Sequence, residues 1–218
     1  MFDIFFLLCY HVSAGRLKAR RVSRRRLAFF AKIEIKNKII GDFMNEVLEN
    51  IVTRRSVRSF VQGKKIPKEI LENIVTAGLF APSALNRQPV CLTVVADKQK
   101  IRKLSLAVGK AMLRDEKYDF YSPEAIIITS CHRDSRFLKE DSSCALENMF
   151  LYAHSVGIGS VWINQLTEVC DNAEVREILC SLGVPSDHVC GGMAALGYPE
   201  ANQPEKDLTR KGKVTYVL

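Results

Sequence analysis

The chain has 218 residues, of which 47% are hydrophobic and 26% are charged, and its formal net charge is +8. This apolar content supports one sizeable core, so the protein is globular, with one or two domains. Residues 1–43 hold ten Lys or Arg against three Asp or Glu, which leaves a net charge of +1 for residues 44–218. Because a nucleic-acid groove needs cations clustered on the folded body, composition disfavours a polyanion-binding protein.

The first 43 residues read as an extension of the domain that follows. Their apolar run, residues 2–10, is shorter than the roughly 20 residues of a membrane-spanning helix. Positive charge follows this run, the reverse of a secretory signal, although an Arg-rich stretch also fits a transit peptide or a membrane-surface arm. A third interpretation is that residues 1–43 are disordered or a start-site artefact, because the codons for Gly41–Met44 can contain a purine-rich ribosome-binding sequence. Met44 is then the physiological start of the domain 44–218.

The stretch Arg54–Phe60 is the first candidate for a binding site. It holds Arg54, Arg55 and Arg58 together with two serines. In an extended segment alternate side chains point to opposite sides, so Arg54, Ser56 and Arg58 share one face. Guanidinium groups donate paired, charge-assisted hydrogen bonds to phosphate, which favours an anion site. The alternative interpretation is a solvated basic turn.

Hydrophobic periodicity predicts five helices, over residues 45–53, 67–78, 98–113, 141–155 and 173–182. Apolar runs predict strands over residues 90–96, 125–129, the end of 156–164, 189–196 and 214–217. Because helices and strands interleave, the fold class is α/β or α+β, with a central sheet covered by helices. The two usual glycine-rich nucleotide motifs are absent from the sequence. Gly157-Ile158-Gly159 fits a close turn from a helix into a strand.

The loop Ala81–Pro89 is the second candidate for a binding site. It is bounded by prolines and filled with short polar side chains. Asn86 and Gln88 each offer a donor and an acceptor, which the edge of a flat heteroaromatic ring requires. The alternative is an ordinary helix-to-strand connector whose side chains cap nearby backbone groups.

Seven cysteines are scattered through the chain without a C-x-x-C pair, namely Cys9, Cys91, Cys131, Cys144, Cys170, Cys180 and Cys190. Their odd number argues against a disulfide framework and favours a reducing compartment, which predicts a cytoplasmic location. The four histidines show no zinc-ligand spacing, so no metal site is expected.

Four stretches in this order resemble the FMN-dependent nitroreductase family: residues 54–60, 81–89, 141–162 and 195–199. The resemblance extends nearly end to end over residues 44–218. It implies an α+β fold with a central mixed sheet flanked by helices, assembled as an intertwined homodimer with FMN at the subunit interface. It also implies a ping-pong oxidoreductase that passes electrons from NADH or NADPH through FMN to nitroaromatics, quinones or similar small acceptors.

The resemblance also assigns roles to residues. Arg54 and Ser56, beside Arg55, would meet the FMN phosphate and ribityl chain, and Arg58 would lie near the pyrimidine edge. A fixed cation there favours the reduced flavin, which gathers negative charge at that edge. No side chain is expected to act as a nucleophile or as an acid–base pair, because the flavin performs the redox chemistry.

Three further groups of residues complete the expected site. A loop of the partner subunit would supply Pro82, Ser83, Ala84, Asn86 and Gln88. One flavin face and edge would be lined by Trp162, Ile163, Asn164 and Gln165, with a backbone N–H directed at N5. The C-terminal phosphate contact would be Arg210, with Lys206, Lys211 and Lys213 as unranked neighbours.

Two departures from the family pattern leave the acceptor open. The segment between the Pro82 loop and the third strand is short, and Arg87 and Val90 stand where relatives often have a small residue and an aromatic one. The alternatives are a flavin-binding protein without turnover and a dehalogenase or flavin-processing relative on the same scaffold. A nucleic-acid or membrane adaptor would rest on residues 1–43 alone.

Overall fold

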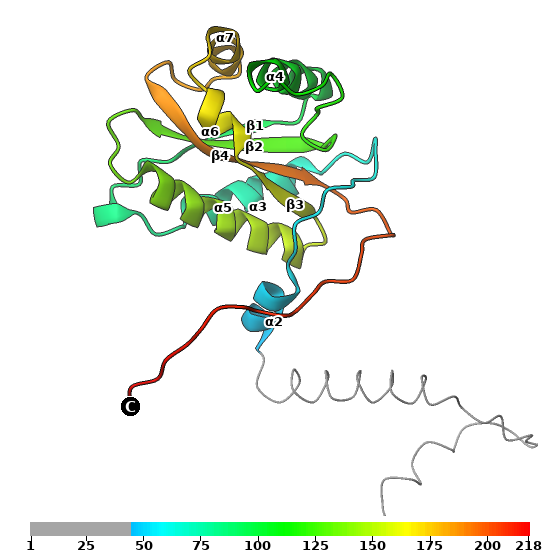
Figure 1. Cartoon of the computed structure of the whole chain (residues 1–218), viewed down its shortest axis with the longest axis vertical. Helices are drawn as coiled ribbons and strands as arrows, with labels where there is room; N and C mark the ends of the chain where they lie inside the picture. Colours follow the sequence, from blue (N-terminus) through cyan, green and yellow to red (C-terminus); the bar gives the residue numbers. More distant parts are fainter. Residues whose placement is uncertain (1–44) are drawn as a thin grey trace, which may run out of the picture. The chain divides into compact units, whose positions relative to one another are not determined.

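The computed structural model describes residues 45–218 (Figure 1). The expectations for the extension, including the transit-peptide, disorder and start-site interpretations, lie outside these residues. Within residues 45–218, no helix combines the length and the apolar character that crossing a bilayer requires.

A four-stranded sheet lies at the centre of the described domain (Figure 1). Its strands, in the spatial order β1-β2-β4-β3, are β1 (Cys91–Val95), β2 (Ala125–His132), β4 (His188–Gly197) and β3 (Gly159–Ile163). All three neighbouring pairs are antiparallel. Within the described residues, a parallel pairing occurs at the isolated bridge between Ser56 and Ser160, so the sheet is mixed at its β3 edge alone.

Helices cover both faces of this sheet (Figure 1). Their bounds are α2 (Glu46–Thr53), α3 (Lys68–Leu79), α4 (Lys98–Ala111), α5 (Leu138–Ser155), α6 (Gln165–Val169) and α7 (Ala173–Ser181). One apolar cluster joins α3 and α5 to one face, and a second joins α4, α6 and α7 to the other. The expected α+β class with a helix-flanked sheet is thereby confirmed.

The central strand β2 shows why two layers of helices are needed. Ile126 and Ile128 pack into the cluster under α4, α6 and α7, whereas Ile127 packs against α3 and α5. Successive side chains of a strand point to opposite faces, so an unbroken isoleucine run must be covered on both. The continuous apolar pattern of residues 125–129 therefore explains why this strand lies at the centre of the domain, with helices on both faces of the sheet.

The expected strand over residues 214–217 is wrong. These residues form no strand, their side chains are exposed, and the tail runs away from the sheet (Figure 1). A strand needs a hydrogen-bonded neighbour, and β-branched composition alone does not supply one. Two short elements were not anticipated, namely α6 and the 3-10 turn η1 (Ala84–Asn86), because both are too short to show a periodic pattern.

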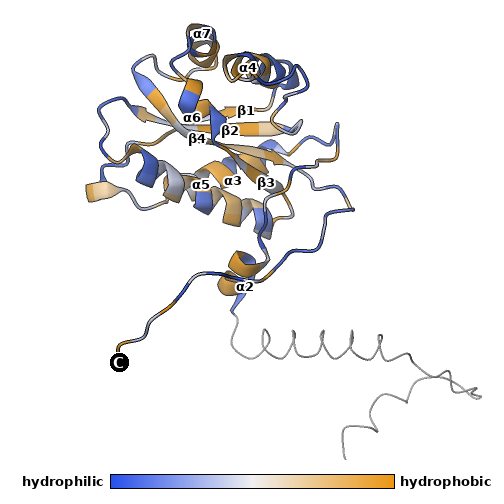
Figure 2. Ribbon diagram, viewed as in Figure 1, coloured by the Kyte–Doolittle hydropathy of each residue, from blue (hydrophilic) through white to orange (hydrophobic). Residues whose placement is uncertain are grey.

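Helix α2 differs from the others because none of its residues is buried. Val47, Leu48 and Ile51 form its apolar side, and Val47 is 65% exposed. Figure 2 shows this apolar colouring on a helix that lies at the margin of the domain. The periodicity correctly predicted the helix, but its apolar face packs on no core within the described chain.

Candidate functional site

The segment Arg54–Phe60 is held against the edge strand β3. Val57 N donates a hydrogen bond to Ser160 O at 2.9 Å, and Ser56 forms a bridge with Ser160. Val57 and Phe60 are buried, whereas the intervening Arg58 is exposed. The two apolar side chains therefore anchor the segment and leave its arginines available for a ligand.

Two glycines allow this close approach. A Cβ built on Gly159 would lie 2.9 Å from Cγ1 of Val57, and a Cβ on Gly197 would lie 2.8 Å from the ring of Phe60. Real Cβ atoms do not approach so closely, so glycine is required at both positions. Gly157 has a different role, because its φ of +76° makes the tight turn expected between α5 and β3.

The C-terminal tail pairs with the same segment from its other side. Glu200 N donates to Ser59 O at 3.2 Å. Further along, the ammonium group of Lys206 donates to the carbonyl oxygens of Val52 and Arg54. These contacts bring Lys206, which the sequence left unranked among the C-terminal cations, directly beside Arg54.

A cluster of cations results, formed by Arg54, Arg55, Lys206 and Arg210. Burial lowers the pKa of Lys206, and the positive charges of Arg210, Arg54 and Arg55 lower it further. The Nε atoms of Arg54 and Arg55 are buried and have no hydrogen-bond partner among residues 45–218. Arg54 Nε lies 3.4 Å from Oε1 of Glu147, an ion-pair distance without hydrogen-bond geometry. A bound anion would satisfy these donors and relieve the repulsion.

The end of α5 completes the surroundings of the cluster. Nε2 of His154 lies 2.9 Å from Thr53 Oγ1, and Asn50 Nδ2 donates to Leu151 O at 2.8 Å. Burial lowers the pKa of His154, and the charges of Arg54 and Lys206 lower it further. The structure therefore favours a neutral imidazole beside the cations.

Arg58 lies close to a loop that the sequence did not single out. Its guanidinium carbon is 5.9 Å from the ring centroid of Tyr121, which is within the range of a cation–π contact. Tyr121 and Gln165 line the same cavity of about 600 Å³. The structure thus brings Arg58 and the expected flavin-lining residue Gln165 to one region through Tyr121.

The other residues at the end of β3 have separate surroundings. The Trp162 ring lies on the α5 side, 6.2 Å from the Phe150 ring, and its Nε1 is buried with no partner among the described residues. Ile163 is 2% exposed and belongs to the opposite cluster, so its side chain cannot line a ligand and only its backbone is available. Asn164 is exposed and lines a second cavity, of about 490 Å³, together with Trp162.

The loop Ala81–Pro89 is held at the opposite end of α5. Ala84 N donates to Oδ1 of buried Asp141 at 2.8 Å, and Gln88 N donates to Ser83 Oγ at 2.9 Å. Asn86 and Gln88 have positive φ angles of 52° and 49°. Some polar side chains therefore cap the loop itself, as the connector interpretation expects, while Pro82 and Asn86 remain exposed.

One chain does not bring the loop and the cation cluster together. The loop is fixed by Asp141 near the start of α5, whereas His154 marks the cluster near its end, and Figure 1 shows the two regions at opposite ends of this helix. At 1.5 Å per residue, these two positions are about 20 Å apart along the helix axis.

Comparisons with known proteins place the chain among relatives of one family. A sequence profile of the nitroreductase family matches residues 51–198. A protein of Archaeoglobus fulgidus, provisionally named NADH dehydrogenase/NAD(P)H nitroreductase, is 33% identical over 168 residues, which are 75% of this chain and 90% of the relative. An NADPH-flavin oxidoreductase of Vibrio harveyi is 30% identical over 173 residues, covering 75% of this chain and 70% of the relative. The crystal structure of a Bacteroides fragilis nitroreductase with bound FMN matches 80% of this chain and 100% of its own, with a TM-score of 0.74 and 37% identity.

Proposed function

The chain belongs to the nitroreductase family, and from this premise we propose that it is an FMN-dependent oxidoreductase that uses NADH or NADPH as electron donor. The names of its relatives and the FMN bound to the Bacteroides fragilis structure support this proposal. The observation that carries it within the chain itself is the cluster of cations at the end of α5, in which two buried guanidinium nitrogens have no hydrogen-bond partner among residues 45–218.

The residues present fit the phosphate of FMN. A phosphate carries about two negative charges near neutral pH and accepts hydrogen bonds through three oxygens. Arg54, Arg55 and Lys206 would hold it, with Arg210 as the further contact from the tail. Burial lowers the pKa of Lys206, and the charges of Arg210, Arg54 and Arg55 lower it further. A bound dianion would offset the repulsion among these cations.

Arg58 would hold the pyrimidine edge of the flavin. The ring of Tyr121 restrains its guanidinium group, so the charge would be fixed before electrons arrive. When bound, FMN supplies the redox chemistry, taking a hydride from the nicotinamide and passing the electrons to the acceptor. The fixed charge of Arg58 would favour the reduced state by preorganised electrostatics.

The acceptor would be a small aromatic or quinone-like molecule. The cavity beside Tyr121 and Gln165, of about 600 Å³, is large enough for such a ring system. As the family resemblance implies, a nicotinamide and an acceptor would use the same exposed flavin face in turn, which is a ping-pong cycle.

A homodimer would complete the site. The loop residues Pro82, Ser83, Ala84, Asn86 and Gln88 would close over the flavin of the partner subunit, because they lie far from the cation cluster of their own chain. The exposed apolar side of α2 and the exposed tail offer surface for such an association. Six free cysteines in the described residues fit a reducing, cytoplasmic setting for this domain.

The test separates phosphate binding from flavin reduction. Arg54→Ala should raise the Kd of FMN about 10- to 100-fold, because one charge-assisted pair is lost. Arg58→Ala should leave the Kd of FMN within about threefold but slow anaerobic flavin bleaching by NADPH about tenfold. Fluorescence titration measures the first quantity and stopped-flow absorbance the second.

Arg136→Ala is the matched control for the change in net charge, because this arginine stacks on Phe137 at the other end of α5. Equal effects of Arg54→Ala and Arg58→Ala on both quantities would contradict the assigned roles. A protein that is colourless after reconstitution with FMN would contradict the proposed function itself.

A further inference from the structure

We propose that Lys98, paired with Glu124, is a positioning residue for Arg58, and that it acts by fixing the loop that carries Tyr121. This inference rests on the proposed function, because Arg58 is the residue assigned to the flavin edge. Lys98 itself is the first residue of α4 and does not line the cavity beside Tyr121 and Gln165, so it would touch neither flavin nor acceptor.

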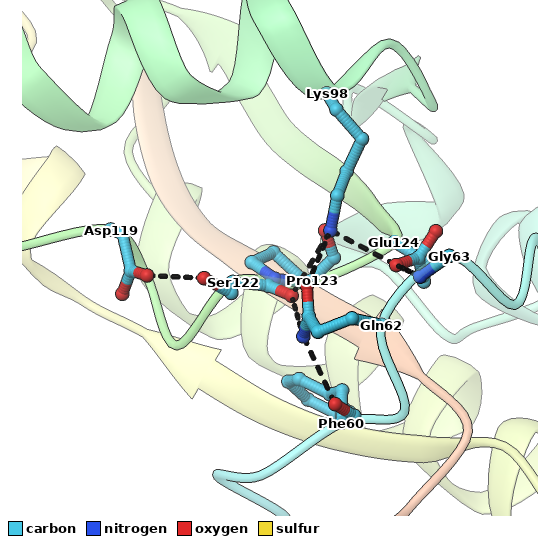
Figure 3. Close-up of polar contacts among 8 residues, drawn as sticks. All are labelled: Phe60, Gln62, Gly63, Lys98, Asp119, Ser122, Pro123 and Glu124. Atoms are coloured by element: carbon cyan, nitrogen blue, oxygen red, sulfur yellow. Dashed lines mark hydrogen bonds and ion pairs between the residues drawn. The ribbon is translucent and has the colours of Figure 1, made fainter.

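The ammonium group of Lys98 joins three segments of the chain (Figure 3). It lies 3.0 Å from Oε1 of Glu124 and 3.0 Å from the carbonyl oxygen of Pro123. It also donates to Oε1 of Gln62 at 3.1 Å and to the carbonyl oxygen of Ser122 at 3.3 Å. One side chain from α4 therefore fixes both the turn after Phe60 and the loop before β2.

The carboxylate of Glu124 makes this contact hard to replace. Its side chain is 2% exposed, and Oε1 also accepts a hydrogen bond from Gly63 N at 2.9 Å. Lys98 is 44% exposed, so the cation stays partly hydrated while the anion does not. Removing the ammonium group would leave a buried carboxylate without its counter-charge, which drives local rearrangement.

The loop that this pair holds has an unfavourable backbone. Phe120, Tyr121 and Ser122 have consecutive positive φ angles of 58°, 70° and 49°. Residues with a Cβ rarely adopt this left-handed conformation, and a run of three persists only where the surroundings impose it. The carboxylate of Asp119 caps the turn, accepting from Tyr121 N at 3.0 Å and from the hydroxyl of Ser122.

Gln62 connects the held loop back to the arginine segment. Its Nε2 donates to Ser122 O at 3.0 Å and to Phe60 O at 3.0 Å, while its Oε1 accepts from Lys98 (Figure 3). Arg58 is therefore restrained along two routes. One passes through the backbone at Phe60, and the other through the ring of Tyr121 beneath its guanidinium group.

The experiment replaces Lys98 by Met, which keeps the stem and removes the charge. We expect Lys98→Met to slow flavin reduction by NADPH about fivefold while the Kd of FMN stays within about twofold. In an Arg58→Ala background, the same change should have no further effect on reduction, because Lys98 acts through Arg58. Lys110→Met is the matched control, since Lys110 lies on the same helix and pairs with exposed Glu174 at 2.7 Å.

A second measurement needs no flavin. Hydrogen exchange of the apo-protein should become faster over residues 57–63 and 118–124 in Lys98→Met and should not change there in Lys110→Met. Glu124→Gln provides a second variant if Lys98→Met folds poorly, because its amide oxygen can still accept from Gly63 N.

The positioning role of Lys98 would be overturned if Lys98→Met and Arg58→Ala slowed flavin reduction independently, so that their effects multiplied in the double variant. Unchanged hydrogen exchange over residues 57–63 and 118–124 in Lys98→Met would also overturn it. Failure of the wild-type protein to bind FMN would instead contradict the proposed function. The exchange result would then still decide whether Lys98 holds the loop, so the two failures can be told apart.

Discussion

Helix α5 meets a different kind of charged group at each of its ends. Near its start, the buried carboxylate of Asp141 accepts a hydrogen bond from Ala84 N, so the loop and the helix satisfy one another. Near its end, the buried Nε atoms of Arg54 and Arg55 have no hydrogen-bond partner among the described residues, although Arg54 Nε lies 3.4 Å from Oε1 of Glu147. Burial lowers the pKa of Lys206 there, and the neighbouring cations lower it further.

Its cluster of cations makes the end of α5 the region suited to an anionic ligand. A buried polar group without a partner costs free energy, so a fold retains one where something else supplies the partner. Both ends of α5 hold such a group, because Ser142 Oγ near its start is also buried without a hydrogen-bond partner among the described residues. The end of α5 differs in that its unsatisfied groups belong to a cluster of cations. In the proposed dimer, the start of α5, where Asp141 holds the loop, would serve as the support from which one subunit closes the site of the other.

The largest effect should come from disturbing the backbone beneath the arginines. In Gly159→Ala, the new methyl group would lie 2.9 to 3.1 Å from three carbon atoms of Val57, a stiff β-branched side chain. We expect a loss of about 1–3 kcal/mol in unfolding free energy and weaker FMN binding, since the arginine segment must move. Thermal unfolding and FMN titration measure the two effects.

Gly157→Ala is the control for this substitution. A Cβ at Gly157 would meet no atom within 4 Å, but its φ of +76° penalises alanine, so stability should fall by about 1 kcal/mol while FMN affinity is kept. If both variants lost FMN affinity to the same extent, general destabilisation, rather than the position of Val57, would control FMN binding at the cation cluster.

A smaller effect is expected at the opposite end of α5. Asp141→Ala leaves Ala84 N without its acceptor, at a cost on the order of 1–2 kcal/mol, and should increase hydrogen exchange in the loop of residues 81–90. Asp141→Asn, which keeps an acceptor oxygen, should recover most of the stability. If the alanine variant also lowered the affinity of a monomeric preparation for FMN, the two ends could not be treated as separate.

The smallest effect concerns pH. In the folded chain the pKa of His154 lies below its ordinary value of 6.5, because of burial and the charges of Arg54 and Lys206. The unfolded chain therefore binds a proton first as pH falls, so the stability from neutral His154 is present above about pH 6.5 and is lost on acidification. Relative to His154→Gln, wild-type apo-protein should lose stability between pH 7 and 5, and added phosphate should reduce that loss. A loss of equal size in the glutamine variant would exclude His154 as its source.

Local patterns in the sequence were sufficient to predict most of the fold. The isoleucine run of β2 specified a sheet covered on both faces, and the main helices begin and end within a few residues of their expected bounds. The strand expected at residues 214–217 was wrong because apolar, β-branched residues give a propensity but no neighbouring strand. Helix α6 has five residues, which is too few for a periodic signal.

The candidate site was only partly predictable, because some of its residues come from distant parts of the sequence. Arg54 and Arg58 stood out because cations in a short extended stretch are a local feature, and the roles expected for them remain predictions. Their neighbours Lys206 and Tyr121 are distant in sequence, and no local pattern records which cation of the tail faces Arg54. Nor does composition show that Ile163 turns its side chain into the core.

Because the tail pairs with the arginine segment, the cation cluster can form only after the tail has been synthesised. Lys206 contacts the backbone of Arg54 across 152 residues of chain. During synthesis at roughly 5–20 residues per second, Arg54 leaves the ribosome about 8–30 seconds before Lys206 does. Strand β4, which pairs with both β2 and β3, ends at Gly197, so the sheet and the cation cluster are both completed by the last part of the chain to be made. A released chain that ended before Lys206 would keep all four strands and lack the cation that contacts the backbone of Arg54.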